Sequence, residues 1–133
     1  MAQAYSMEGF EIRVDGGVLE MRTEGVRTAA MGRDPGRSFA TFLANSKVTA
    51  IVYDIRGATY EFTPTAWEER ARVLARLCNP YPTALVARPD QDAQIFRIVE
   101  LINQRGGIGL ACRSREAARS WLDGLATIAN QVD

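Results

Sequence analysis

Short apolar runs recur at three places in this 133-residue chain, and they constrain its fold more than any other feature. They cover Thr49–Asp54, Thr83–Ala87 and Ile108–Cys112. None shows the alternation of apolar and polar residues that marks a half-exposed strand. Runs of this kind are typical of strands that are covered on both faces, as in a parallel sheet. We therefore expect an α/β domain.

Segments with helical periodicity alternate with these runs and favour right-handed crossovers. Start and stop signals place four helices. They are expected from Asp34-Pro35, with Asp34 as N-cap, to Asn45; from Thr63-Pro64 to Cys78; from Asp90 or Asp92 to about Gln104; and from Ser114 to about Leu125.

Two segments near the N-terminus alternate with period two and are joined by a glycine pair. Phe10–Asp15 and Val18–Thr23 flank Gly16-Gly17, which predicts an antiparallel hairpin. The expected order is β-β-α-β-α-β-α-β-α, with a loop at Arg56–Thr59. This predicts a mixed, mostly parallel sheet of about five strands with four helices. An exposed hairpin edge at Phe10–Val14 favours a two-fold homodimer.

The composition fits one globular domain over residues 1–133, with its core between residues 8 and 125. Sixteen basic residues balance sixteen acidic ones, so no positive field favours nucleic acid or an anionic membrane. No segment approaches the roughly 20 apolar residues that span a bilayer. Met1–Phe10 lacks the pattern of a secretion signal. These features predict a cytoplasmic protein without nucleic-acid partners.

The sequence contains no histidine. Histidine is the commonest general base near neutral pH and the commonest zinc ligand. Cys78 and Cys112 lie far apart and outside any metal-ligand spacing, so we expect free thiols in a reducing compartment. An enzyme would depend on carboxylates, Tyr, Cys or Lys47. We therefore predict no catalytic residue, no metal site and no cofactor.

Two adjoining stretches carry a family pattern. In Val52–Gly57 (VYDIRG) an apolar strand ends in an Asp-led turn with Gly, and Tyr60–Thr65 (YEFTPT) leads into a helix with hydroxyl groups at its start. Together with the element order, they resemble the STAS domain of anti-sigma-factor antagonists, and most nearly the SpoIIAA-like proteins. One hydroxyl at this helix start is a phosphorylation switch in that family, and the resemblance implies the same role for Thr63 or Thr65.

Two interpretations of these hydroxyl groups are open, phosphorylation and helix capping. A phosphate on Thr63 or Thr65 would meet free backbone N–H groups and the positive end of the helix dipole. Alternatively, Thr63 caps a helix whose first residue is Pro64. Phe62 stands where the family signature has Asp. We therefore expect the capping role for Thr63.

Other candidate residues surround the predicted turn. Asp54, Arg56 and Gly57 follow a buried strand, and ligands of open α/β sheets bind at the carboxyl ends of strands. An Asp that bonds its own turn is the structural alternative for Asp54. Tyr60 and Phe62 would place two aromatic rings in a loop, which is typical of a partner surface or a pocket lip.

Three functions are compatible with these features. The leading hypothesis is a non-catalytic, cytoplasmic, STAS-like interaction or regulatory module of bacterial type, with its protein partner bound between Arg56 and Phe62 and at the next helix start. The alternative is a carrier or sensor of a small apolar, lipid-like molecule. The third is a carboxylate-driven enzyme that uses Asp54 with Tyr60 or Glu61.

Overall fold

The computed structural model describes the backbone of residues 3–131, and their side chains except those at 3, 32–34 and 129–131. The strands are β1 (Gln3–Met7), β2 (Phe10–Asp15), β3 (Val18–Thr28), β4 (Ala50–Glu61), β5 (Thr83–Val86) and β6 (Gly109–Cys112). The helices are α1 (Arg33–Asn45), α2 (Pro64–Cys78), α3 (Asp92–Gln104) and α4 (Arg115–Gln131), with 3-10 helices at Ala29–Gly32 and Pro89–Gln91.

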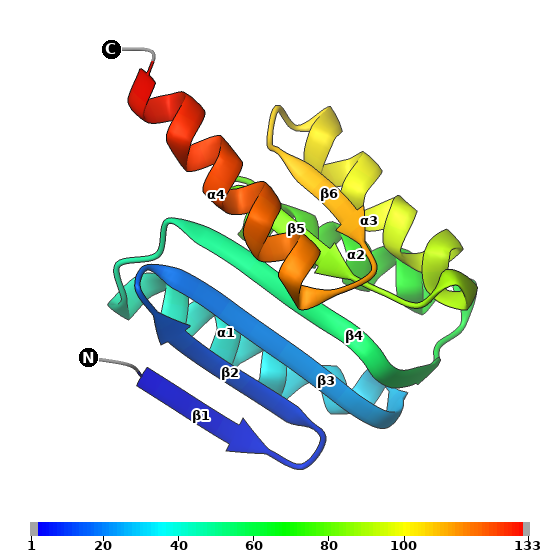
Figure 1. Cartoon of the computed structure of the whole chain (residues 1–133). Coiled ribbons are helices and arrows are strands. Elements are labelled where there is room, and N and C mark those ends of the chain that lie inside the picture. The colour runs from blue at the N-terminus through cyan, green and yellow to red at the C-terminus, as the bar shows by residue number, and fades with distance from the viewer. Residues whose placement is uncertain (1–2, 132–133) are drawn as a thin grey trace.

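The six strands form one mixed sheet in the order of the sequence (Figure 1). β1–β2 and β2–β3 are antiparallel pairs, whereas β3–β4, β4–β5 and β5–β6 are parallel pairs. The predicted α/β class and mixed sheet are therefore confirmed, with six strands in place of about five. β1 was missed because its five residues, QAYSM, contain no β-branched residue and no clear alternation.

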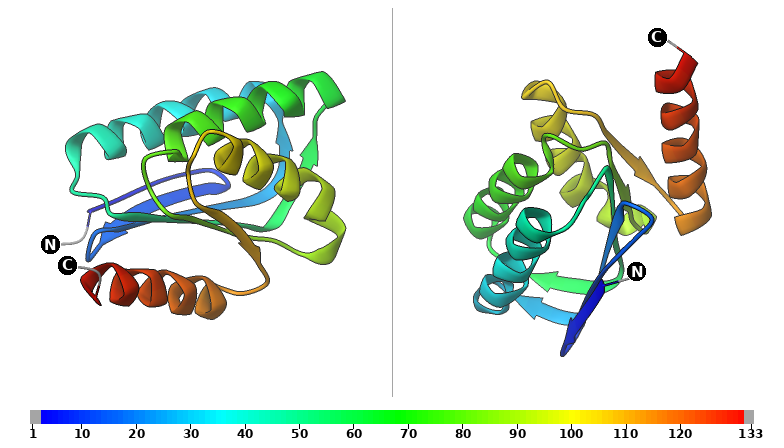
Figure 2. Two further views of the ribbon diagram at one scale, coloured as in Figure 1. Left: turned by 90° about the horizontal axis from the view of Figure 1, so that it is seen from above. Right: turned by 90° about the vertical axis from the view of Figure 1, so that its left-hand side faces the viewer.

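The helices are divided unequally between the two faces of the sheet. Figure 2 shows α1, α2 and α3 on one face and α4 on the other. Each of the first three helices connects neighbouring parallel strands, and the chain always steps in the same direction across the sheet. Right-handed crossovers then place all three on the same face. α4 follows the last strand and is free of this constraint.

The main core lies between the sheet and α1–α3. Alternate residues of β2, β3 and β4 point into it, and helix residues such as Phe39, Leu74 and Ile98 fill it from the other side. A smaller apolar cluster lies under α4; its buried members are Ala50, Val52, Ala84, Val86, Ala118 and Leu122. The central strands β4 and β5 are thus covered on both faces, as their apolar runs predict.

The predicted hairpin turn is confirmed. Gly16 and Gly17 adopt φ angles of 60° and 82°, which suit the tight turn between β2 and β3. A Cβ on Gly17 would also come within 2.9 Å of the Thr49 hydroxyl oxygen. The edge assignment, however, is wrong, because β1 pairs along the whole of Gln3–Met7 with β2. The Phe10–Val14 edge that motivated a homodimer is therefore already paired within the chain.

Predicted boundaries differ from the structure at β3, β4 and α4. β3 continues beyond Thr23 to Thr28. The expected loop at Arg56–Thr59 is part of β4, which continues to Glu61 and pairs with the end of β3 after a register shift. α4 extends beyond Leu125 to Gln131. α1 begins at Arg33, and the predicted capping role of the Asp34 side chain lies outside the described residues.

Within the described residues, no helix combines the length and apolar character needed to cross a bilayer.

Candidate functional site

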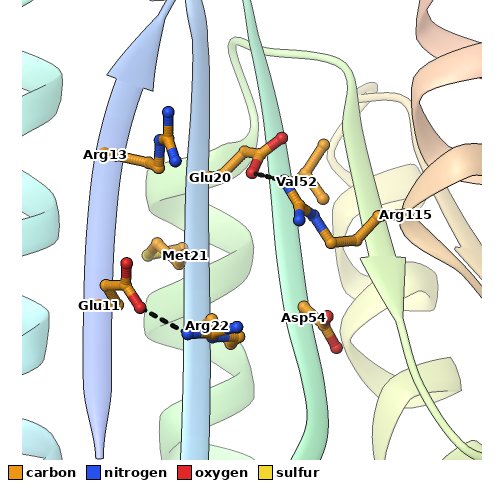
Figure 3. A pocket seen from close by; sticks show the side chains of 8 residues that line it. All are labelled: Glu11, Arg13, Glu20, Met21, Arg22, Val52, Asp54 and Arg115. Atoms are coloured by element: carbon orange, nitrogen blue, oxygen red, sulfur yellow. Dashed lines mark hydrogen bonds and ion pairs between the residues drawn. The ribbon is translucent and has the colours of Figure 1, made fainter. Parts of the chain in front are cut away.

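The face of the sheet that carries α4 is open over its antiparallel part. α4 contacts β4, β5 and β6, and Figure 2 shows β1 and β2 extending beyond it. Between α4 and β2 lies a hollow of about 240 Å³, called here the polar hollow (Figure 3). Its lining contains three carboxylates and three guanidinium groups together with two apolar residues: Glu11, Arg13, Glu20, Met21, Arg22, Val52, Asp54 and Arg115.

Glu20 connects the polar hollow to α4. Its side chain is only 10% exposed, although it lies on the opposite face of β3 from the main core. Its carboxylate accepts a hydrogen bond from Arg115 Nη2 and one from Arg119 Nε at 2.9 Å, both from the first turns of α4. Two cations therefore neutralise one nearly buried carboxylate, and this ion pairing fixes the start of α4 over the sheet.

Asp54 lies at the other end of the polar hollow and is held by Arg56. Its side chain is 6% exposed. Oδ1 accepts hydrogen bonds from the Arg56 backbone N and Nε, both at 3.0 Å, and Oδ2 accepts one from Nη2 at 2.9 Å. Burial raises the pKa of Asp54, but these hydrogen bonds and the charges of Arg56 and Arg115 outweigh it and leave the pKa below its usual value. Asp54 is therefore an ionised, fully engaged carboxylate.

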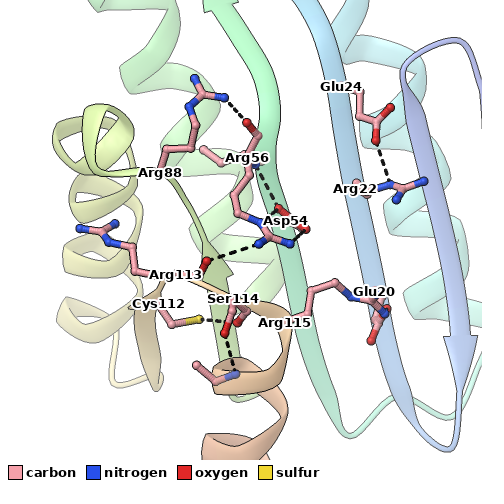
Figure 4. A network of polar contacts seen from close by, with 12 residues as sticks. Glu20, Arg22, Glu24, Asp54, Arg56, Arg88, Cys112, Arg113, Ser114 and Arg115 are labelled. Atoms are coloured by element: carbon pink, nitrogen blue, oxygen red, sulfur yellow. Dashed lines mark hydrogen bonds and ion pairs between the residues drawn. The ribbon is translucent and has the colours of Figure 1, made fainter.

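Two contacts from arginine side chains to backbone carbonyl oxygens continue from Arg56 beside the carboxyl ends of β5 and β6 (Figure 4). Arg56 Nη1 donates to the Arg113 carbonyl oxygen at 3.4 Å, and Arg88 donates to the Arg56 carbonyl oxygen. Arg88 pairs with Asp90 at 3.0 Å, and Arg113 pairs in bidentate fashion with Asp92 at 2.6 and 2.7 Å. Each guanidinium thus has a carboxylate partner inside the chain.

The β4 irregularity is supported by a buried amide. Gln91 Nε2 donates to the carbonyl oxygen of Ile55 at 2.9 Å, inside the irregular stretch, and to that of Ala58 at 3.0 Å, just after it. Carbonyl groups that lose their strand partners at a bulge need such donors. The polar groups at this edge therefore serve mainly to hold the strand ends together.

Tyr60 and Phe62 lie on the opposite face of the sheet from Asp54. Both rings pack edge-on against Trp67 of α2, with ring centroids 5.0 and 5.6 Å away. The Tyr60 hydroxyl lies 3.3 Å from that of Tyr53, which accepts a hydrogen bond from the Thr23 hydroxyl at 3.0 Å. The predicted exposed aromatic loop is therefore wrong, because the rings complete the core under α2. Burial raises the pKa of Tyr60 well above its usual value.

The hydroxyl groups at the start of α2 differ in their contacts. Thr63 Oγ1 accepts a hydrogen bond from Ala66 N at 3.1 Å, and Pro64 is the first helical residue, so the predicted cap is confirmed. Thr65 is exposed. Gly57 is also exposed and lies opposite Glu24 in the parallel β3–β4 pair.

The structure separates the predicted site into two. Asp54 lines the polar hollow and Arg56 is paired with it, whereas Tyr60, Phe62 and Thr63 belong to the α2 face. Sequence reasoning missed the hollow residues of β2, β3 and α4: Glu11, Arg13, Glu20, Arg22 and Arg115. The alternation of charges along Phe10–Asp15 and Val18–Thr23 was the signal that could have placed four of them on one face.

The cysteines and acidic groups provide no metal site in the described part of the chain. Cys78 and Cys112 are free, and burial raises the pKa of the Cys78 thiol to about 12.

No model of a known protein family matches the chain, and a search of curated proteins finds no relative.

Proposed function

We propose that this chain is a non-catalytic, STAS-like interaction module whose protein partner binds at the polar hollow. The observation that carries the proposal is the open sheet face beside α4, where charges of both signs surround a recess of about 240 Å³. Charge patterns of this kind set the specificity and the association rate of protein complexes. The order of strands and helices supports the STAS-like assignment. The partner surface proposed here is the polar hollow, in place of the stretch from Arg56 to Phe62 that the sequence suggested.

The state of the two carboxylates nearest the α4 side of the hollow supports a non-catalytic role. Both oxygens of Asp54 accept hydrogen bonds from Arg56, and Glu20 is paired with Arg115 and Arg119. A general acid or base must exchange its proton with a substrate at a suitable pKa. The low pKa of Asp54 and its complete engagement oppose that role.

The same lining gives no support to an apolar ligand. Pockets for apolar molecules are lined mainly by hydrophobic and aromatic side chains. The aromatic rings of Tyr60, Phe62 and Trp67 instead pack against one another. Native mass spectrometry of freshly purified protein checks this point, because a copurified apolar molecule would favour the carrier function.

Charge reversal at the rim tests the proposal. Arg13 is half-exposed and its ion pair with Asp15 is long, at 3.8 Å, so Arg13→Glu should leave the fold intact. We expect partners captured from the native cells to bind this variant about tenfold more weakly, which corresponds to about 1.4 kcal/mol. Arg105→Glu, at the distant end of α3, is the matched control and should retain them. Equal capture by both variants would contradict the assignment of the surface.

A further inference from the structure

A second arginine site lies on the opposite face of the sheet, at the ends of β3 and β4. Arg27 is only 5% exposed. Its guanidinium lies under the β1–β2 turn, where Nη1 donates to the Glu8 carbonyl oxygen at 3.0 Å. A Cβ on Gly9 would come within 2.4 Å of the same nitrogen, so the glycine allows the turn to close over the charge.

This buried cation has no carboxylate partner among the described residues. Glu24 is the nearest acid in sequence and Glu8 lies in the turn above the guanidinium, and both of their side chains are exposed. Glu24 pairs with Arg22 at 3.3 Å, and Glu8 contributes its backbone carbonyl to Arg27. A guanidinium has five N–H donors, and burying its charge is costly without a counter-ion. Arg56, Arg88 and Arg113 also contact backbone carbonyl groups, but each of them has a carboxylate partner as well, and Arg27 differs from them in this respect.

Arg27 opens onto a small pocket between the strand ends and the starts of α1 and α2. The pocket is lined by the hydroxyl groups of Thr23, Thr28, Tyr53 and Tyr60, by the apolar groups of Phe10, Pro35 and Phe62, and by Arg27 and Arg70. Among the residues that the structure describes, no carboxylate lines this pocket. The polar hollow differs, because its three guanidinium groups face three carboxylates.

We propose that this pocket binds the carboxylate end of a small ligand, with Arg27 as the recognising group. A carboxylate is planar and matches the donor geometry of a guanidinium. The free volume is about 10 Å³, which is close to the space of one water molecule. One carboxylate oxygen fits there, whereas a tetrahedral phosphate requires the walls to move. The rest of the ligand lies at the pocket mouth.

Acetate is the simplest probe, and thermal unfolding at constant ionic strength measures its binding. Replacing 0.1 M chloride by 0.1 M acetate should raise the Tm of the natural protein by about 3 °C. Arg27→Met keeps most of the side-chain volume and should lose this increase. Arg13→Met removes an arginine from the opposite face and should keep it. An equal increase in all three proteins reflects general salt effects and would overturn the proposal.

A second measurement avoids any dependence on the folding of the variant. In the natural protein, the Nε–H resonance of Arg27 should shift as acetate is titrated, while that of Arg13 should remain unchanged. The absence of a shift up to 0.2 M acetate would overturn the proposal. A larger effect with phosphate than with acetate would overturn the assignment of the ligand class. Neither result depends on a protein partner at the polar hollow, so the two proposals fail independently.

Discussion

The two faces of the sheet are built from alternate residues of the same strands, yet they differ in almost every physical property. Ile12 is fully buried against the helices, and its neighbour Arg13 is half-exposed in the polar hollow. Three helices close the first face with large apolar side chains. The second face has one helix, a small apolar cluster and a row of charges. Stability therefore comes mainly from one face, which leaves the other available for binding.

Substitutions at neighbouring positions of β2 sharpen this comparison most. Ile12→Ala should lower the free energy of unfolding by about 2–5 kcal/mol, because it removes buried methyl groups and leaves a cavity. Arg13 is the next residue of β2 and faces the open side of the sheet. Arg13→Ala should therefore change the free energy of unfolding by less than about 0.5 kcal/mol. Chemical denaturation measures both. Similar losses at the two positions would contradict the division between the faces.

The turn between β2 and β3 sets the register that keeps the faces separate. Gly17→Val should destabilise the protein by about 1–3 kcal/mol, because φ is positive and the new side chain would meet Thr49. Gly16 has a similar φ but open space around it, so Gly16→Ala is the milder control. An unchanged denaturation midpoint for Gly17→Val would show that the turn does not need this conformation.

Glu20 provides a smaller, local effect on the open face. Glu20→Gln keeps the shape of the side chain but removes the charge that pairs with Arg115 and Arg119. We expect a loss of about 1–2 kcal/mol, discounted because both arginines are half-exposed. Hydrogen exchange should become faster in α4 and stay unchanged in α2 and α3. Uniform acceleration in all helices would show that α4 is not held separately.

The smallest effect is a pH dependence from Asp54. The folded protein holds the pKa of this carboxyl below its usual value, so its contribution to stability is present above the unfolded pKa of about 4 and disappears as the pH falls through the folded pKa. The difference in unfolding free energy between the natural protein and Asp54→Asn should therefore shrink below pH 4. A constant difference from pH 7 to pH 3 would contradict the Arg56 contact.

Much of the fold could be predicted because its signals are local. The glycine pair, the Thr63-Pro64 cap and the apolar runs of β4 and β5 each depend on neighbouring residues. β1 could not be predicted because it is stabilised by pairing with β2 rather than by its own sequence. The β4 extension was missed because Gly57 resembles a turn residue, while its support from Gln91 is distant in sequence.

The candidate site was less predictable because it depends on tertiary contacts. Asp54 and Arg56 are close in sequence, and their pairing follows directly from that closeness. Arg115 and Glu20 are separated by most of the chain, and no local pattern joins them. Tyr60 was assigned to a loop because the register shift that returns it to the core side cannot be read from composition.

Site-specific photo-crosslinking in the native cells tests the central claim most directly. A photoreactive residue at position 13 lies at the rim of the polar hollow, and one at position 105 lies at the end of α3, away from it. If the open face is the binding surface, position 13 yields a discrete crosslinked protein and position 105 does not. Crosslinks of equal yield at both positions, or at position 105 alone, would contradict the account.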